Sequence, residues 1–191
     1  ALQFKESVTW SFVSSSGFAV RYSPIGFMFD VGGSSLFPEK LSVHSFVAFL
    51  CSKVALNLLK ILNPTMNFQV GNVSDLPIIF PKQESIKQQI DLLTQECIDI
   101  SKKDWDSRET SWDFSKNELL KHLVPKGTLC EKSDSKIETA YNNYCQVWSE
   151  KFYKLHANEE ELNRLFIDIY ELGDELTPDV ALKDITILKS E

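Results

Sequence analysis

The sequence predicts an α+β fold, with a small mixed β-sheet domain that contains a buried helix, followed by a helical spacer of long amphipathic helices. Apolar and polar side chains alternate at residues 8–13, which is typical of a half-buried strand. Residues 43–62 are apolar on nearly every side, which is typical of a helix inside a core. Residues 83–103 carry a single apolar stripe at helical spacing, which indicates an amphipathic helix.

Two further strands are expected near the N-terminus. Residues 18–22 and 27–31 are rich in aromatic and β-branched side chains, which favour strands. The residues between them, 23–26, include Pro24 and Gly26. Proline presets the backbone of a turn and glycine tolerates a positive φ, so we expect a hairpin at this point. The Gly-Gly-Ser-Ser sequence at 32–35 predicts a second, flexible loop.

The apolar helix has clear candidate ends. Ser42 or Ser45 can cap its start, and Pro64 stops it because the residue before a proline is pushed out of the helical region. Lys53 and Lys60 interrupt the apolar surface, and we expect them to extend to solvent or to face a partner. Residues 66–70 and 76–80 then predict two short strands around a turn at 71–72.

The second half of the chain is expected to be helical. The stripe on the 83–103 helix should be buried against later helices and consists of Ile86, Ile90, Leu93, Cys97 and Ile100. A short helix is possible at 116–123. Two more amphipathic helices are expected at 135–156 and 158–172, with Asn158 and Glu161 as an N-terminal capping pair and Gly173 at the C-terminal end. The tail ends in a possible strand.

These elements suggest three segments: an α+β domain at 1–82, a helical spacer at 83–173, and an acidic tail at 174–191 that leads to a missing C-terminal region. No run of eighteen apolar residues occurs, so no membrane association is expected. The first residues have neither a basic nor an apolar signal-peptide region. Four cysteines lack metal-ligand spacing and are expected to be reduced, which indicates a cytoplasmic protein: Cys51, Cys97, Cys130 and Cys145.

The net charge of −7 is unevenly distributed. Residues 1–82 contain six basic and four acidic side chains, a net of +2, which leaves −9 for the remainder. A polyanionic partner is therefore expected to meet the first segment rather than the second.

No catalytic or metal-binding motif is complete. The Asn-Pro-Thr-Met sequence at 63–66 resembles the loop with which amino-methyltransferases hold a flipped base, but threonine and methionine replace its second proline and its aromatic ring. The glycines at 32–33 lack the lysine of a phosphate-binding loop. Pro178 and Asp179 could open a nuclease motif, but no carboxylate stands two residues before Lys189. The three histidines are isolated in the sequence and predict neither a metal site nor a catalytic triad.

A different signal comes from Trp10, Arg21, Tyr22 and the serine- and glycine-rich loops. Arginine binds guanine edges and phosphates, small polar side chains bind either, and aromatic rings stack or wedge, so the combination suits DNA. The alternative is that Trp10, Phe12 and Phe18 are simply core and that the serines are solvated.

Four stretches carry a resemblance to a known family. Residues 8–38, 47–80, 100–114 and 161–187 resemble the C-terminal half of the PglX adenine-specific DNA methyltransferases of BREX phage-defence systems, which are similar to fused restriction-modification enzymes. The helix followed by Asn-Pro-Thr and then by Phe-Gln-Val-Gly looks like the end of a target recognition domain. The resemblance covers about two-thirds of the chain.

The resemblance implies a fragment that selects the DNA site for an adenine-N6 methyltransferase. It implies double-stranded DNA, the missing N-terminal methyltransferase domain and other defence subunits as partners. It implies S-adenosylmethionine as the cofactor of the parent and no cofactor or catalytic residue in this segment. The candidate DNA contacts are Trp10, Ser15, Arg21, Tyr22, Ser34, Lys53 and Gln69. The alternative is a protein-interaction module, in which the acidic helices at 83–173 dock another subunit without direct DNA contact.

Overall fold

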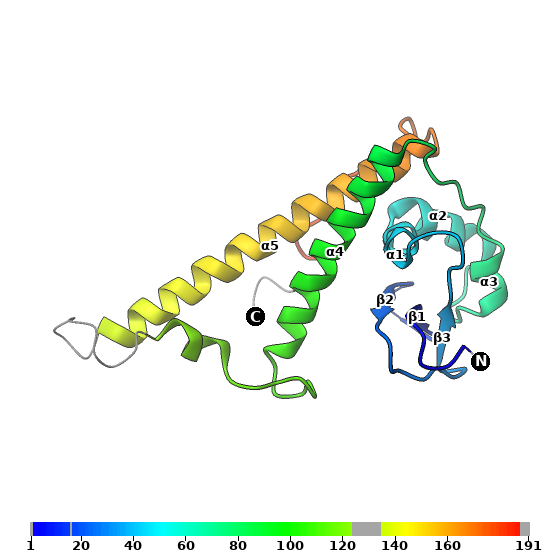
Figure 1. Ribbon diagram of the computed structural model, residues 1–191. Helices are drawn as coiled ribbons and strands as arrows, with labels where there is room; N and C mark the ends of the chain where they lie inside the picture. Colours follow the sequence, from blue (N-terminus) through cyan, green and yellow to red (C-terminus); the bar gives the residue numbers. More distant parts are fainter. Residues whose placement is uncertain (1, 16, 124–134, 188–191) are drawn as a thin grey trace. The chain divides into compact units, whose positions relative to one another are not determined.

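The computed structural model describes residues 2–15, 17–123 and 135–187 (Figure 1). The chain begins with three strands, β1 (Ser7–Ser11), β2 (Val20–Ser23) and β3 (Gly33–Leu36). Helices follow: α1 (Val43–Cys51), α2 (Lys53–Leu62), α3 (Val70–Ser74), α4 (Glu84–Asp106), the 3-10 helix η1 (Glu118–His122) and α5 (Ser135–Ile169). One small sheet among many helices confirms the predicted α+β class.

The chain divides into two compact units. The first unit contains residues 1–96 and 158–179, and the second contains residues 97–157 and 180–191. The first unit thus includes the start of α4 and the end of α5 in addition to the segment 1–82. The assignment of residues 1–82 to recognition and of 83–173 to a spacer concerns function as well as folding, and it stays a prediction.

The sheet has the order β2-β1-β3 and is antiparallel in both pairings, rather than mixed. The predicted hairpin at 23–26 is therefore wrong, because β2 pairs with β1 and the connection from residue 24 to residue 32 crosses to the far edge. Residues 27–31 are not a strand, whereas the expected flexible loop at 32–35 contributes to β3. The Phe29 ring packs on Phe37 at 5.1 Å, and the Gln3 side chain hydrogen-bonds the backbone N and O of Phe29, so local contacts hold this connection.

The long apolar helix is interrupted at Ser52. The Ser52 hydroxyl donates to the Phe49 carbonyl at 2.7 Å and accepts from the Ala55 N–H at 3.3 Å, so it ends α1 and caps α2. The two helices meet at 67°. Ser42 caps α1, as one of the two predicted candidates, and its hydroxyl also donates to Asp91 of α4 at 2.8 Å.

The predicted strands at 66–70 and 76–80 are wrong. Residues Val70–Ser74 form α3, and the one isolated bridge among the described residues pairs Asn67 with Val13 in antiparallel orientation. The backbone of residues 77–79 bonds to a side chain rather than to a neighbouring strand. The Tyr170 hydroxyl donates to the Pro77 carbonyl at 2.6 Å and accepts from the Ile79 N–H at 2.8 Å.

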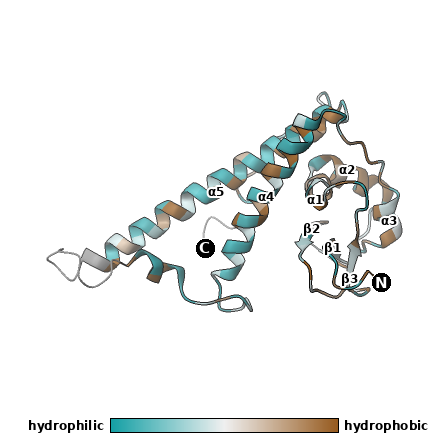
Figure 2. Cartoon of the chain, in the orientation of Figure 1, coloured by the Kyte–Doolittle hydropathy of each residue, from teal (hydrophilic) through white to brown (hydrophobic). Residues whose placement is uncertain are grey.

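Aromatic rings form the centre of the first unit. Phe49 of α1 is fully buried, stacks on Tyr170 at 5.8 Å and contacts Phe166 of α5 at 5.7 Å. Figure 2 shows the apolar character of α1 and α2, in contrast to the alternating polar and apolar residues of α4 and α5. No single described helix has the length and apolar composition to cross a membrane; α1 and α2 meet those criteria only as a bent pair, and their apolar residues include core residues such as Phe49 and Leu59.

Helix α5 is continuous where two helices were predicted. Asn158 lies inside it and donates to Glu96 of α4 at 2.8 Å, so it does not cap a second helix. The chain leaves α5 at Glu171, which has a φ of 55°. The Glu171 N–H donates to the Asp168 carbonyl, and the Leu172 N–H donates to the Ile167 carbonyl. This is the Schellman arrangement, two residues before the predicted cap at Gly173.

The apolar stripe of α4 is only partly buried. Ile90 is fully buried, whereas Ile86 and Leu93 are half-buried. In the second unit, Cys97 and Ile100 pack against a cluster formed by Phe152 and Leu155 of α5 with Ile185 and Ile187 of the tail. The tail is therefore held by side-chain burial, and its described residues do not form the expected strand.

Candidate nucleic-acid interface

The sheet has one face toward the core and one polar face. Val8 and Trp10 of β1 are buried, so the intervening Thr9 and Ser11 lie on the opposite face. The strand register places Arg21 and Ser35 directly beside Thr9, one on each neighbouring strand. This polar face, defined by Thr9, Ser11, Arg21 and Ser35, thus presents one guanidinium among three hydroxyl groups.

Arg21 is exposed, and its side chain extends along this face. Its Nη2 donates to the Ser11 hydroxyl at 3.1 Å. Asp30, the acidic side chain in the connection from β2 to β3, accepts from the Gly33 N–H at 3.0 Å. A guanidinium has five donors, so the single bond to Ser11 leaves Arg21 able to bind a phosphate or a base edge.

Tyr22 lies on the other face of β2 and is half-buried. Its ring stacks on His44 of α1 at 5.6 Å with an interplanar angle of 18°. Burial, together with a hydrogen bond to Glu6, raises the pKa of the Tyr22 hydroxyl above its ordinary value. These contacts join β2 to α1 and direct the ring away from the polar face that carries Arg21.

Trp10 and Ser34 are buried, which disfavours their predicted role as DNA contacts, and that role stays a prediction. Trp10 is 1% exposed, and its indole N–H donates to the Phe68 carbonyl at 2.9 Å. Ser34 is 7% exposed, and its carbonyl accepts from the Thr9 hydroxyl at 3.0 Å. For Trp10 this burial favours the core alternative.

Lys53 holds the chain after α5. Its ammonium donates to the Thr177 carbonyl at 3.0 Å and also to the Asp179 carbonyl. The Lys53 backbone N–H donates to Asn163 Oδ1 at 2.9 Å, and the Asn163 amide donates to the Pro178 carbonyl at 3.4 Å. Lys53 therefore holds residues 177–179 against the start of α2.

Ser15 and Gln69, the two remaining candidates, are exposed. Gln69 precedes α3, and its backbone N–H donates to Asn72 Oδ1 at 3.0 Å. The register does not place either residue beside Arg21. The sheet instead brings Arg21 together with three hydroxyl residues that were not singled out in the sequence, because their common face follows from strand pairing rather than from a motif.

The Asn-Pro-Thr-Met sequence organises the backbone. Asn63 is 9% exposed; its amide group donates to the Asn67 carbonyl at 2.7 Å, and its Oδ1 accepts from the Thr65 hydroxyl at 2.7 Å and from the Thr65 N–H at 3.2 Å. These bonds occupy the groups with which a methyltransferase loop would hold a target amine. The sequence therefore ends α2 and fixes the following loop.

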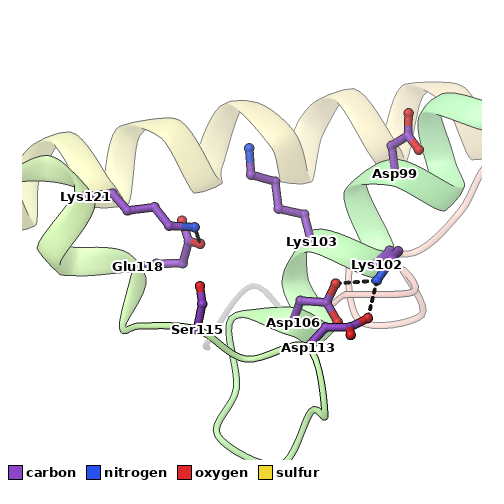
Figure 3. Close-up of a pocket in the computed structure, with 8 residues that line it drawn as sticks. All are labelled: Asp99, Lys102, Lys103, Asp106, Asp113, Ser115, Glu118 and Lys121. Atoms are coloured by element: carbon purple, nitrogen blue, oxygen red, sulfur yellow. Dashed lines mark hydrogen bonds and ion pairs between the residues drawn. The ribbon is translucent and has the colours of Figure 1, made fainter.

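A separate pocket of about 320 Å³ lies within the second unit (Figure 3). Lys102 contacts Asp106 at 2.6 Å and Asp113 at 2.9 Å, and Lys121 pairs with Glu118. The hydrogen bond with Lys102 lowers the pKa of the Asp106 carboxyl, and the same pairing raises the pKa of the Lys102 ammonium. The charges compensate one another, and the described residues contain no group of three or more side chains suited to hold a metal ion.

No family model matches the chain. Two curated proteins are similar to it over nearly its whole length. The adenine-specific methyltransferase PglX of Lacticaseibacillus casei (strain Zhang) is 40% identical over 188 residues, which cover 98% of this chain and 15% of that protein. The adenine-specific methyltransferase BrxX of Escherichia coli O9:H4 (strain HS) is 34% identical over 184 residues, which cover 95% of this chain and 14% of that protein.

These matches fit a C-terminal fragment of a PglX-like protein. The resemblance inferred from the sequence is thereby confirmed. The chain spans only about 15% of the length of the curated relatives it matches, so the similarity relates it to a small part of a methyltransferase.

Proposed function

We propose that this chain selects the DNA site for a longer, S-adenosylmethionine-dependent adenine-N6 methyltransferase of a phage-defence system. The observation that carries the proposal is the 40% identity to PglX across 98% of the chain. The parent enzyme would flip an adenine out of the duplex and methylate it, while this segment would set the sequence around that adenine.

The polar face is the part of the chain best suited to contact DNA. Arg21 is exposed, retains unused donors, and lies among hydroxyl groups that can bind phosphate oxygens. Ser11 fixes the position of the guanidinium before binding, which reduces the entropy lost when a contact to DNA forms. A bidentate contact to a base edge would specify one base pair, whereas a phosphate contact would only position the domain.

The test is methylation of a randomised DNA library by the full-length parent and by its Arg21→Ala variant. If Arg21 contacts a base edge, the variant loses discrimination at one position, equivalent to about 1–3 kcal/mol. If Arg21 contacts phosphate, all sequences are methylated more weakly with the same preference. An unchanged preference together with unchanged DNA affinity would refute the role of Arg21.

A control variant separates a contact by Arg21 from a general loss of positive charge. Lys40→Ala also removes an exposed cation from the first segment, but Lys40 lies outside the polar face, so this substitution should leave the sequence preference unchanged and affect affinity less than Arg21→Ala does. If Lys40→Ala and Arg21→Ala had the same effect, the polar face would not be the contact surface.

A second candidate is the docking of another defence subunit. The charge of the first compact unit favours this alternative: residues 83–96 and 158–179 contribute eleven acidic and two basic side chains, so the unit as a whole carries −7 despite its +2 segment. If the chain is a docking module, substitutions in its acidic helices should weaken binding of the partner subunit and leave the DNA affinity of the full-length parent unchanged.

A further inference from the structure

Trp112 has an unusual position in the second unit. It lies in the turn between α4 and η1, and its side chain is 97% exposed. This is the largest exposed fraction among the large apolar side chains of the described residues. A tryptophan ring buries a large area when it packs, and this ring keeps nearly all of that area available for a contact with another molecule or domain.

Hydrogen bonds fix the turn that carries Trp112. The preceding residue, Ser111, is 8% exposed; its hydroxyl donates to Asp106 at 2.9 Å and accepts from the Asp113 N–H at 3.2 Å. Lys102 bridges Asp106 and Asp113 (Figure 3). The residues on both sides of Trp112 are thus tied to α4, which holds the indole outward on a supported backbone.

This arrangement is the one that makes an aromatic residue effective at an interface. Trp is among the residues that contribute most to binding when their rings fill a pocket. A side chain on a braced turn also loses little backbone freedom on binding, so more of the contact energy becomes affinity.

The charges around the turn indicate what kind of surface it meets. Residues 104–114 contain four acidic side chains and one basic side chain, Arg108, and Arg108 is paired with Asp104 at 2.9 Å. Lys102 is engaged by two carboxylates. Phosphates approaching Trp112 would therefore meet an excess of acidic groups and paired cations, which disfavours nucleic acid and favours an apolar protein pocket.

We propose that Trp112 inserts into an apolar pocket on another folded part of the same longer polypeptide, outside these 191 residues. The two relatives extend far beyond the matched region, which makes up only 15% and 14% of their lengths. The remaining sequence of such a protein offers surface that is always present at high local concentration. The contact would fix this segment relative to the rest of the polypeptide, and it does not rest on DNA recognition.

The first test places the photoreactive residue p-benzoylphenylalanine at position 112 of the full-length parent. Leu120, which is 52% exposed in the same unit, is the control position. We expect irradiation to join position 112, but not position 120, to a peptide of the same molecule outside residues 1–191. Isotope-labelled mixtures identify links between two copies. A link to a second copy, to another protein or to DNA, or no more cross-linking than at position 120, would overturn the proposal.

The second test compares Trp112→Ala, Trp112→Phe and Leu120→Ala in the same full-length protein. If docking protects the turn, backbone amides of residues 104–114 exchange about 30-fold faster in Trp112→Ala, an intermediate amount faster in Trp112→Phe, and unchanged in Leu120→Ala. Because the side chain is almost fully exposed, the substitution leaves the fold of the segment intact. Equal exchange in the wild type and in Trp112→Ala would show that nothing covers the turn.

Discussion

Trp10→Phe tests whether the tryptophan of β1 supports the fold or reads DNA. Trp10 is 1% exposed and its indole N–H donates to the Phe68 carbonyl at 2.9 Å, across 58 residues of sequence. Its ring also lies 6.3 Å from that of Phe18, which in turn lies 5.1 Å from that of Phe68. Phenylalanine retains an aromatic ring at the site but removes the hydrogen-bond donor.

The expected loss of stability has two parts. A buried carbonyl left without its donor costs about 1–3 kcal/mol. The smaller phenyl ring leaves unfilled volume where the second indole ring lay, and this adds about 1 kcal/mol. Together they predict that Trp10→Phe lowers the free energy of unfolding by about 2–4 kcal/mol.

Urea denaturation, followed by circular dichroism, measures this difference. A loss below about 0.5 kcal/mol, the range of surface substitutions, would show that Trp10 is not a core residue. In the full-length parent, Trp10→Phe should leave the methylated sequence unchanged even if the amount of folded enzyme falls. A changed sequence preference would restore Trp10 as a DNA contact.

Three further predictions concern the helices and the cofactor. Ile90→Ala should cost about 2–5 kcal/mol in chemical denaturation because Ile90 is fully buried, and Leu93→Ala should cost less because Leu93 is half-buried; equal losses would contradict the observed packing of α4. Glu171→Gly should stabilise the protein by about 1 kcal/mol in thermal unfolding, since the φ of 55° at this position suits glycine, and a lower Tm would argue against the Schellman end of α5. The isolated chain should give no binding heat with S-adenosylmethionine because its sequence has no glycine-rich cofactor loop, and one-site binding would refute this.

The sequence predicts helices better than it predicts their interruptions. The apolar composition of residues 43–62 reveals a buried helical segment, but the break depends on Ser52 forming two specific hydrogen bonds at its own position. Serine can also occur inside a helix, so the residue type does not distinguish the two cases. Asn158 shows the reverse: it has the chemistry of a cap, but its side chain bonds Glu96 from the interior of α5.

Strand pairing is harder to predict because it depends on residues far apart in sequence. Residues 27–31 have the composition of a strand, whereas the Gly-Gly-Ser-Ser stretch has that of a loop. Pairing with β1 nevertheless selects Gly33–Leu36, because the Asp30 carboxylate and the packing of Phe29 on Phe37 hold the preceding residues as a connection. Tertiary contacts thus override local strand propensity.

The candidate site depends in part on the same long-range strand pairing. Arg21 stands out in the sequence as a cation in a segment rich in aromatic and small polar residues, and the structure leaves it exposed. Its neighbours Thr9 and Ser35 become recognisable only from the register that places them on the same face. Lys53 has the right charge for DNA, but its use of the Thr177 and Asp179 carbonyls depends on a chain return of more than one hundred residues.

The charge of the folded unit also predicts how DNA binding should respond to salt. The +2 of residues 1–82 is outweighed in the same compact unit by acidic residues at 83–96 and 158–179, so long-range attraction to DNA cannot carry recognition there. If Arg21 contributes one phosphate contact, Arg21→Ala in the full-length parent should reduce the slope of log affinity against log salt by about 0.9. Binding measured between about 50 and 200 mM salt resolves such a change. A base contact alone would leave the slope nearly unchanged while altering sequence preference, whereas a much larger fall in the slope would mean that several cations had been displaced, which contradicts a single local contact by Arg21.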